Sequence, residues 1–359
     1  MRLACPQQDR TEAPWHRERG SSCPLLRGPV PCPPLPRAAA RLCKDVSCIR
    51  RLPHCRNAAG PGPAAATDTK AVDIAAWVRD VSFHAERGEQ ATSVQRLIAF
   101  HPPAGPEADG RIRVTAESQA ALIADLDRHF AARRGFAVAT INLDHLVKLQ
   151  GDAAFRAAYL QQTHVTADGN PVVWLHRLAG RRVELVTGAD LVVPLCRAAA
   201  ARGVTVAFLG SETEVLDEAA AALEARIPGL RVVCRIAPPF GFEPDSAAAD
   251  ADLDRIAASG AGLCFLALGA PKQERLAARG QARLSGCGFV SVGAALDFLA
   301  GRQRRAPLWM RRIAMEWVWR ILTNPRRLAL RYARCAIALP GLGALALEER
   351  RGAPPSHQT

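Results

Sequence analysis

The chain has 359 residues, 49% of them hydrophobic, and a formal net charge of +13. It can therefore hold one large or two modest domains around a buried core, which excludes a wholly disordered or fibrous protein. The positive charge gathers near the two ends: residues 1–70 carry twelve Lys and Arg against five Asp and Glu, and residues 302–335 carry ten Arg against the single acid Glu316.

Residues 1–70 are predicted to be a disordered tail, because they are rich in Pro, Arg, Cys and Gly and show neither helical nor strand periodicity. Two explanations stay open: a start codon assigned too far upstream, or a genuine basic tail. Six of the eleven cysteines lie within the first 55 residues without a repeated Cys-x-x-Cys spacing, which predicts neither zinc nor a disulfide framework. The other five stand in apolar contexts, and no apolar signal-peptide core is present, so we expect a cytoplasmic protein.

Strands and helices alternate from about residue 71 onward. In chain order the pattern predicts a helix over 118–130, strands over 136–141 and 204–209, a helix over 214–227, and strands over 232–234, 263–268 and 288–292. Such alternation with short loops is typical of an α/β fold, so we expect a Rossmann-like, mainly parallel sheet with helices on both faces, spanning residues 71–301.

A glycine-rich turn follows the strand predicted over 263–268, with the sequence Gly269-Ala270-Pro271-Lys272-Gln273-Glu274. A buried strand that ends in such a turn and opens a helix presents backbone N–H groups to an anion, here with Lys272, Gln273 and Glu274 beside them. A nucleotide-sugar pyrophosphate would suit this arrangement. The alternative is an ordinary strand-to-helix connection.

Other polar residues also follow predicted strands or turns, where α/β proteins bind their ligands. Thr140, Asn142 and Asp144 come at or after the end of the strand at 136–141, Asp168 lies in an Ala-Asp-Gly turn, and Asp297 follows the glycine turn at residue 293. Each of them singly is also explained as a turn former or a helix cap.

The C-terminal region divides into a basic helical appendage over 302–345 and a disordered tail over 346–359. The appendage interleaves arginines with Trp309, Trp317 and Trp319, which suggests an anionic membrane surface or a phosphorylated ligand and not a nucleic acid. The alternative is a core-packing helix whose charges are solvated. No membrane-spanning helix is predicted, since the nearest apolar stretch, Cys335 to Leu347, is short and broken by Pro340-Gly341.

Taken in order, several blocks of this sequence resemble the WecG/TagA/CpsF glycosyltransferases, glycosyltransferase family 26, over about residues 80–335. The blocks are Thr140-x-Asn142-x-Asp144-His145, Ala167-Asp168-Gly169, Val186-Thr187-Gly188-Ala189-Asp190-Leu191, Phe208-Leu209-Gly210, Pro238-Pro239-Phe240-Gly241-Phe242, the hexapeptide from Gly269 to Glu274, the segment from Val292 to Gly301, Arg305-Ala306-Pro307-x-Trp309 and Glu316-Trp317.

The resemblance implies transfer of a sugar from a UDP-sugar to a polyprenyl-diphosphate-linked saccharide at the cytoplasmic face of the bacterial membrane, with inversion, in envelope or exopolysaccharide synthesis. It implies that Asp168 is the general base, with Thr140 and Asn142 completing the catalytic set. It also implies that Gln273 and Asp297 line the substrate pocket. Relatives can self-associate, so a homo-oligomer is one alternative that the resemblance leaves open. Arginines of the appendage would complete the site; the matching positions are Arg320, Arg327 and Arg331.

The chemistry of an inverting sugar transfer supports these roles independently of the resemblance. An inverting transfer needs one carboxylate to take the acceptor proton, and the leaving UDP needs fixed cations, backbone N–H groups or a metal. The arginines of the appendage supply fixed cations, and the turns at Gly210 and Gly269 supply backbone N–H groups. The Asp-x-Asp runs at 125–127 and 250–252 fall in helical contexts where residues two apart point to different faces, so we expect no metal and no cofactor.

One position departs from many relatives, which carry an arginine where this chain has Leu185. Two alternatives stay open: the sugar or phosphate contact of that arginine is absent, or Arg181 or Arg182 replaces it, so the donor sugar stays open too. Two other function classes were weighed. A non-catalytic nucleotide-binding or membrane-scaffolding protein is the alternative, disfavoured because Asp168, Thr140 and Gln273 are all present. A nicotinamide-dependent oxidoreductase is set aside, because no Gly-x-Gly-x-x-Gly turn follows the first strand.

Overall fold

A computed structural model of the chain describes residues 97–101, 109–323 and 325–352, without the side chains of residues 325–327. The tail predicted over 1–70 and the last residues, 353–359, lie outside the described residues. The described part of the chain forms an α/β fold around one parallel sheet, as the strand–helix alternation predicts.

Six strands form this sheet in the order β2-β1-β6-β5-β3-β4, and all of the neighbouring pairs are parallel. The strands are β1 (Phe136–Ile141), β2 (His164–Ala167), β3 (Val206–Gly210), β4 (Val232–Ile236), β5 (Leu263–Ala267) and β6 (Gly288–Ser291). Only β2 was not predicted; it has four residues, two of them the polar but buried His164 and Thr166. A short strand with a mixed composition carries too little periodicity to identify.

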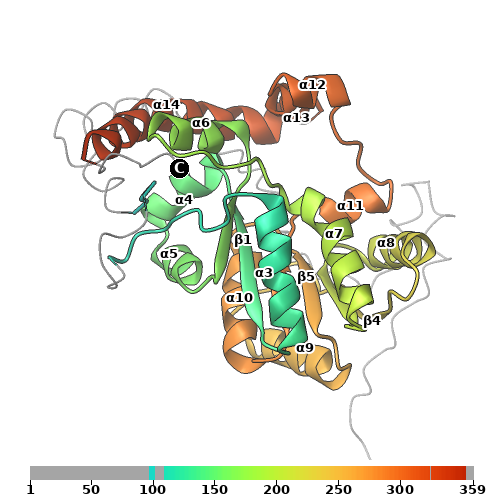
Figure 1. Cartoon of the computed structure of the whole chain (residues 1–359). Helices are drawn as coiled ribbons and strands as arrows, with labels where there is room; N and C mark the ends of the chain where they lie inside the picture. The colour runs from blue at the N-terminus through green and yellow to red at the C-terminus, as the bar shows by residue number, and fades with distance from the viewer. Residues whose placement is uncertain (1–96, 102–108, 324, 353–359) are drawn as a thin grey trace, which may run out of the picture. The chain divides into compact units, whose positions relative to one another are not determined.

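Helices connect the strands and cover both faces of the sheet (Figure 1). They are α3 (Gln119–Ala131), α4 (Leu143–Gly151), α5 (Ala153–Leu160), α6 (Asn170–Leu178), α7 (Gly188–Ala201), α8 (Thr213–Arg226), α9 (Ala247–Ala258), α10 (Lys272–Arg283), α11 (Ala295–Leu299), α12 (Leu308–Arg312), α13 (Glu316–Thr323) and α14 (Pro325–Gly352).

Alternate residues of the strands serve opposite faces, as the two-residue repeat of a strand requires. Phe136 and Val138 of β1 pack into a cluster with α3, α7, α8 and α11, whereas Ala137 packs into a second cluster with α9 and α10. Farther along β1, Ala139 and Ile141 join a third cluster with α4, α5, α6 and α14. The sheet is therefore buried on both faces, and only its edges and the ends of its strands are left for chemistry.

The C-terminal segment corrects two expectations. Helix α14 continues through Pro340 and Gly341, which were predicted to break it, and it runs on to Gly352, so residues 346–352 are helical where a disordered tail was expected. The physical reason is packing: α14 lies against α4 and α6 and buries Leu342, Leu345 and Ala346 in their shared core.

The end of α14 is also fixed by polar contacts. The Glu349 carboxylate accepts hydrogen bonds from the backbone N–H of Phe100 and of His101, at 2.8 and 3.3 Å, and it forms an ion pair with Arg111. Removal of residues 302–359 would therefore uncover part of the core, so point variants test the appendage more cleanly than a deletion.

Within the described residues, one helix is long and apolar enough to cross a membrane by length and composition, the stretch Leu328–Gly352 of α14. The sequence pattern does not predict this long apolar helix, because Pro340-Gly341 interrupts the apolar stretch. Buried positions make up 17% of its most apolar window, so most of that window faces away from the protein core.

Candidate active site

The carboxyl ends of β1 and β2 bring Thr140 and Asp168 together. The two strands pair in register, Thr140 beside Thr166, and the backbone N–H of Asp168 donates to the Ile141 carbonyl at 2.8 Å. The Thr140 hydroxyl donates to Oδ2 of Asp168 at 3.3 Å. Asp168 is thus held at the edge of the sheet where ligands of parallel-sheet proteins bind.

The environment of Asp168 makes it a stronger base than an ordinary aspartate. Burial raises the pKa of its carboxyl, and nearby Glu316 raises it further, while the Arg320 charge, the Thr140 hydrogen bond and the Arg305 charge lower it in part. The net direction is upward, and a base with a raised pKa binds a proton more strongly during transfer.

A buried tyrosine and a buried histidine form a chain of hydrogen bonds to the Thr140 backbone carbonyl. The Tyr159 hydroxyl donates to the Thr140 carbonyl at 3.0 Å, so its oxygen accepts from Nδ1 of His145, 2.7 Å away. Burial lowers the pKa of His145 to about 3, which keeps the ring neutral. Asn142 caps α4, its side-chain oxygen accepting from the His145 N–H at 3.0 Å.

Gln273 connects two turns of this edge. Its Oε1 accepts from the backbone N–H of Gly269 at 3.2 Å and of Gly293 at 3.0 Å, and its Nε2 donates to Glu274 at 2.8 Å. Glu274 is fully buried, and burial raises its pKa to about 7. Gln273 therefore joins the two turns through its side-chain oxygen, and its Nε2 donates to the buried Glu274.

The turn after β3 shows why its glycine is required. Gly210 has a φ of +118°, and a Cβ there would lie 2.5 Å from the backbone of Ala267. The next residue, Ser211, donates from its hydroxyl to Asp297 at 3.4 Å. Burial raises the pKa of Asp297. The turns at Gly210 and Asp297 are thus neighbours.

The positively charged residues predicted for the site differ in the partners that their side chains contact. Arg320 of α13 pairs with Glu316 at 2.9 Å and acts electrostatically on Asp168. Arg331 pairs with Asp144 at 2.9 Å, and Lys272 turns toward the Phe242 carbonyl and Glu243. The side chain of Arg327 lies outside the described side chains.

Arg305 is a further cation near Asp168, and the sequence pattern did not single it out. It donates to Asp190 at 2.6 Å and to the Thr187 hydroxyl at 3.1 Å, and its charge also lowers the pKa of Asp168. The signal was available, because Arg305 and Asp190 both lie in blocks that carry the family resemblance. Tyr159 was missed as well, and no local pattern identifies it.

The position of the family's arginine is taken by Leu185, which is exposed. The Arg181 guanidinium is already engaged in other contacts, because it donates to the Phe100 carbonyl at 2.8 Å and to Glu117 at 2.7 Å. Of the two expected substitutes, Arg182 carries no such bond among those described.

Comparison with known proteins identifies the family of the chain. The profile of the glycosyl transferase WecG/TagA/CpsF family matches residues 110–354. A curated relative, N-acetylglucosaminyldiphosphoundecaprenol N-acetyl-beta-D-mannosaminyltransferase of Bacillus spizizenii, is 25% identical over 228 residues, which cover 63% of this chain and 84% of the relative. The chain therefore belongs to the WecG/TagA/CpsF family of glycosyltransferases.

Proposed function

We propose that this member of the WecG/TagA/CpsF family moves a hexose or N-acetylhexosamine-type sugar from a UDP-sugar onto a lipid-linked diphosphate saccharide, with inversion and with Asp168 as general base. The observation that carries the proposal is the pair of Asp168 and Thr140 at the carboxyl edge of the sheet, 3.3 Å apart and partly withdrawn from water.

In the proposed reaction the acceptor hydroxyl oxygen attacks the anomeric carbon while Asp168 takes its proton. The bond from that carbon to the UDP oxygen breaks, and UDP leaves with the electron pair. The Thr140 hydroxyl holds the carboxylate in place. A single base and a direct displacement yield inversion, since no covalent sugar–enzyme intermediate forms.

The charge that develops on UDP needs fixed positive groups. Arg320 and Arg305 both act electrostatically on Asp168, so they lie near the reacting atoms. Backbone N–H groups of the glycine turns add neutral donors. With these groups in place the proposed transfer proceeds without a metal or cofactor at this edge.

The same appendage suits a peripheral position on the inner face of the membrane. Its exposed apolar side chains are Leu308, Trp309, Ile313, Trp317 and Leu322. Arginines accompany them along α12 and α13, and each basic residue near an anionic leaflet contributes about 1 kcal/mol, less at high salt. Such a surface would hold the active site beside a lipid-linked acceptor.

The relative suggests where to begin with substrates. Its name describes an N-acetylmannosaminyl transfer to an N-acetylglucosaminyl-diphospho-lipid. At 25% identity, and with Leu185 replacing the family's arginine, this chain is proposed to share the class of donor and acceptor rather than the same sugar.

The test incubates the purified full chain with EDTA, a panel of UDP-sugars that includes UDP-N-acetylmannosamine, and a short-chain lipid-diphosphate-sugar acceptor. We expect acceptor-dependent UDP release by the wild type and a loss of about 10²–10⁴-fold in Asp168→Asn. The anomeric configuration of the product, determined by NMR, reports inversion or retention.

Asp254→Asn is the matched control, because Asp254 is an exposed carboxylate on α9 that pairs with Arg283 and, among the described residues, forms no hydrogen bond or ion pair with Asp168 or Thr140. Release that persists in Asp168→Asn would remove the general-base role. No release with any donor, also after addition of Mg²⁺ or Mn²⁺, would favour the alternative of a non-catalytic nucleotide-binding or membrane-scaffolding protein.

A further inference from the structure

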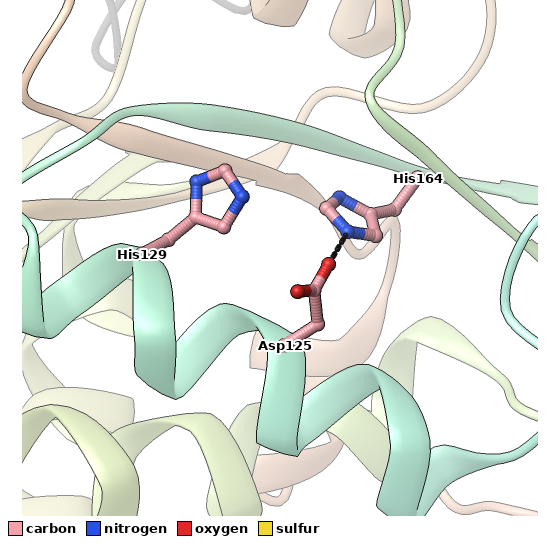
Figure 2. Close-up of side chains that lie close together, drawn as sticks. All are labelled: Asp125, His129 and His164. Atoms are coloured by element: carbon pink, nitrogen blue, oxygen red, sulfur yellow. Dashed lines mark hydrogen bonds and ion pairs between the residues drawn. The ribbon is translucent and has the colours of Figure 1, made fainter.

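Three potential metal ligands meet at the amino edge of the sheet, away from Asp168. Asp125 and His129 stand one turn apart on α3, and His164 is the first residue of β2 (Figure 2). One ligand atom from each of the three lies within 4.8 Å of the other two, and both histidines are buried. Among the described residues no other group of three such side chains is as close together.

Hydrogen bonds fix which nitrogen of His164 faces the cluster. The single proton of the Thr163 hydroxyl goes to the Ala137 carbonyl at 2.9 Å, so Nδ1 of His164, 2.8 Å from that hydroxyl oxygen, donates to it. In the neutral ring, Nε2 then carries a lone pair, and it lies 2.6 Å from Oδ2 of Asp125. Two acceptors at this distance share a proton, and a metal ion replaces that proton only when the two atoms move apart.

His129 is held in the matching tautomer. Its Nδ1 lies 3.2 Å from the carbonyl oxygens of both Arg134 and Gly135, so Nδ1 carries the proton. Its Nε2 accepts from the Arg134 guanidinium at 3.2 Å, and the figure shows a ring nitrogen of His129 directed toward His164. Proteins commonly orient metal-binding histidines by a backbone carbonyl that accepts from one ring nitrogen, and here the lone pair of the other nitrogen accepts from Arg134.

The distances suit a small transition-metal ion after a modest closure. Ligand atoms around tetrahedral Zn²⁺, with bonds of 2.0–2.2 Å, lie about 3.4 Å apart. The separation of 2.6 Å between Asp125 and His164 must widen and the longest separation, within 4.8 Å, must shorten. Space is available, since the three side chains line a solvent-open pocket of about 550 Å³.

Two arginines contact the side chains of this cluster. Arg134 occupies the His129 lone pair, and Arg128 pairs with the second oxygen of Asp125 at 2.6 Å. Both arginines are exposed, so either guanidinium can turn into solvent. Arg134 therefore competes with a metal ion for the same nitrogen, and this competition can be tested.

We propose that Asp125, His129 and His164 form a binding site for a divalent transition-metal ion of the Zn²⁺ type, which ties α3 to the start of β2. Imidazole and carboxylate ligands suit Zn²⁺, with water completing the tetrahedron. The site lies at the opposite ends of the strands from Asp168, so its role is structural and the proposed transfer does not use it.

The first experiment measures Zn²⁺ and Co²⁺ binding to the metal-free full chain by calorimetry and visible spectroscopy. Cysteines elsewhere in the chain can bind metal too, so the informative quantity is the difference between variants. We expect the wild type and Asp127→Asn to bind one equivalent more than Asp125→Asn or His129→Gln. Asp127 lies on the same helix but pairs with Arg202, which makes it the matched control.

The added equivalent of Co²⁺ should show the visible bands of a tetrahedral nitrogen–oxygen site without sulfur-to-cobalt charge transfer. Zn²⁺ should raise the unfolding temperature of the wild type and not that of Asp125→Asn. The unfolding curves without metal establish that each variant folds. Equal stoichiometry in the wild type and in both ligand variants would overturn the proposal and leave a proton-bridged Asp125–His164 pair.

Arg134→Gln gives a second test that a purely structural cluster would not satisfy. Because the variant frees the His129 lone pair, we expect Zn²⁺ to bind about tenfold or more tightly, the size of effect known for groups around a metal site. Unchanged or weaker binding would contradict the assigned His129 ligand. Transfer with EDTA, measured separately, is expected to be unaffected, so failure of the metal site and of the proposed function are distinguishable.

Discussion

One aspartate lies near each end of β2, and the neighbours of the two carboxylates differ: Asp168 follows the strand, whereas Asp125 of α3 faces its first residue, His164. Asp168, at the carboxyl edge, faces the Thr140 hydroxyl and the electrostatic field of Arg320 and Arg305. Asp125, at the amino edge, faces an imidazole nitrogen at 2.6 Å, with a second imidazole close by.

This difference teaches that the residue type does not decide the chemistry. A carboxylate beside a hydroxyl and fixed cations can take a proton from a substrate, because burial raises its pKa and the cations keep its charged form accessible. A carboxylate beside the lone pairs of imidazole nitrogens can bind a metal cation together with them. Four variants test how the neighbours of a side chain set its effect.

The largest effect is expected from Arg320→Gln at the carboxyl edge. Loss of one fixed cation should lower the transfer rate about 10²–10³-fold. Because the Arg320 charge lowers the pKa of Asp168, its removal raises that pKa, so the acid limb of the rate profile should move to higher pH.

The measurement is acceptor-dependent UDP release as a function of pH, with the exposed Arg312→Gln of the same appendage as control. An Arg320→Gln profile that coincides with that of the control would show that Arg320 does not act on the base.

Gly210→Ala should lower the free energy of unfolding by about 2–4 kcal/mol, since it adds both a strained positive φ and overlap with the Ala267 backbone. Gly229→Ala separates the two causes, because Gly229 has a φ of +80° with nothing within 4 Å of its added Cβ. Denaturant unfolding of both variants gives the comparison, and equal losses would rule out the overlap.

Glu274→Gln should reduce the pH dependence of stability. With its pKa raised from 4.5 to about 7 by burial, Glu274 holds a proton in the folded state that the unfolded state has lost, so stability falls as the pH rises through this window. The variant should recover at most about 3 kcal/mol at alkaline pH.

Chemical denaturation from acidic to alkaline pH tests this, with the exposed Glu214→Gln as control. A slope that is the same in both variants would show that Glu274 ionises normally in the folded protein.

The smallest effect is expected from Asp127→Asn, which should leave transfer, metal binding and the unfolding midpoint unchanged within error. Its partner Arg202 is exposed, and such surface pairs contribute little. A loss of metal binding here as large as in Asp125→Asn would mean that the effect belongs to α3 as a whole and not to the ligand.

Much of the sheet could be predicted because β1, β3 and β5 are largely apolar, buried runs that end in glycine or polar turns. The strand expected over 136–141 has these bounds in the structure, and the helix expected over 118–130 is shifted by a single position. The opposite directions of Asp125 and Asp127 were also predicted, and they are confirmed by their partners, His164 and Arg202.

The candidate site was predicted in part. Family blocks identified Asp168, Thr140 and Gln273, but not that Gln273 bonds to the turns at Gly269 and Gly293. The end of the fold at residue 346 was misplaced, because the sequence showed an apolar segment interrupted by Pro340-Gly341 and gave no sign of the α4 and α6 surfaces that stabilise it.

By itself, the sequence determined the alternation of elements, the residues that face the core and the family to which the blocks belong, since these depend on neighbours along the chain. Only the tertiary structure decided which polar residues meet: Thr140 with Asp168, Arg305 with Asp190, and Asp125 with His164. Each pair joins distant segments through the order β2-β1-β6-β5-β3-β4, which local periodicity does not encode because it is set by how the whole sheet packs.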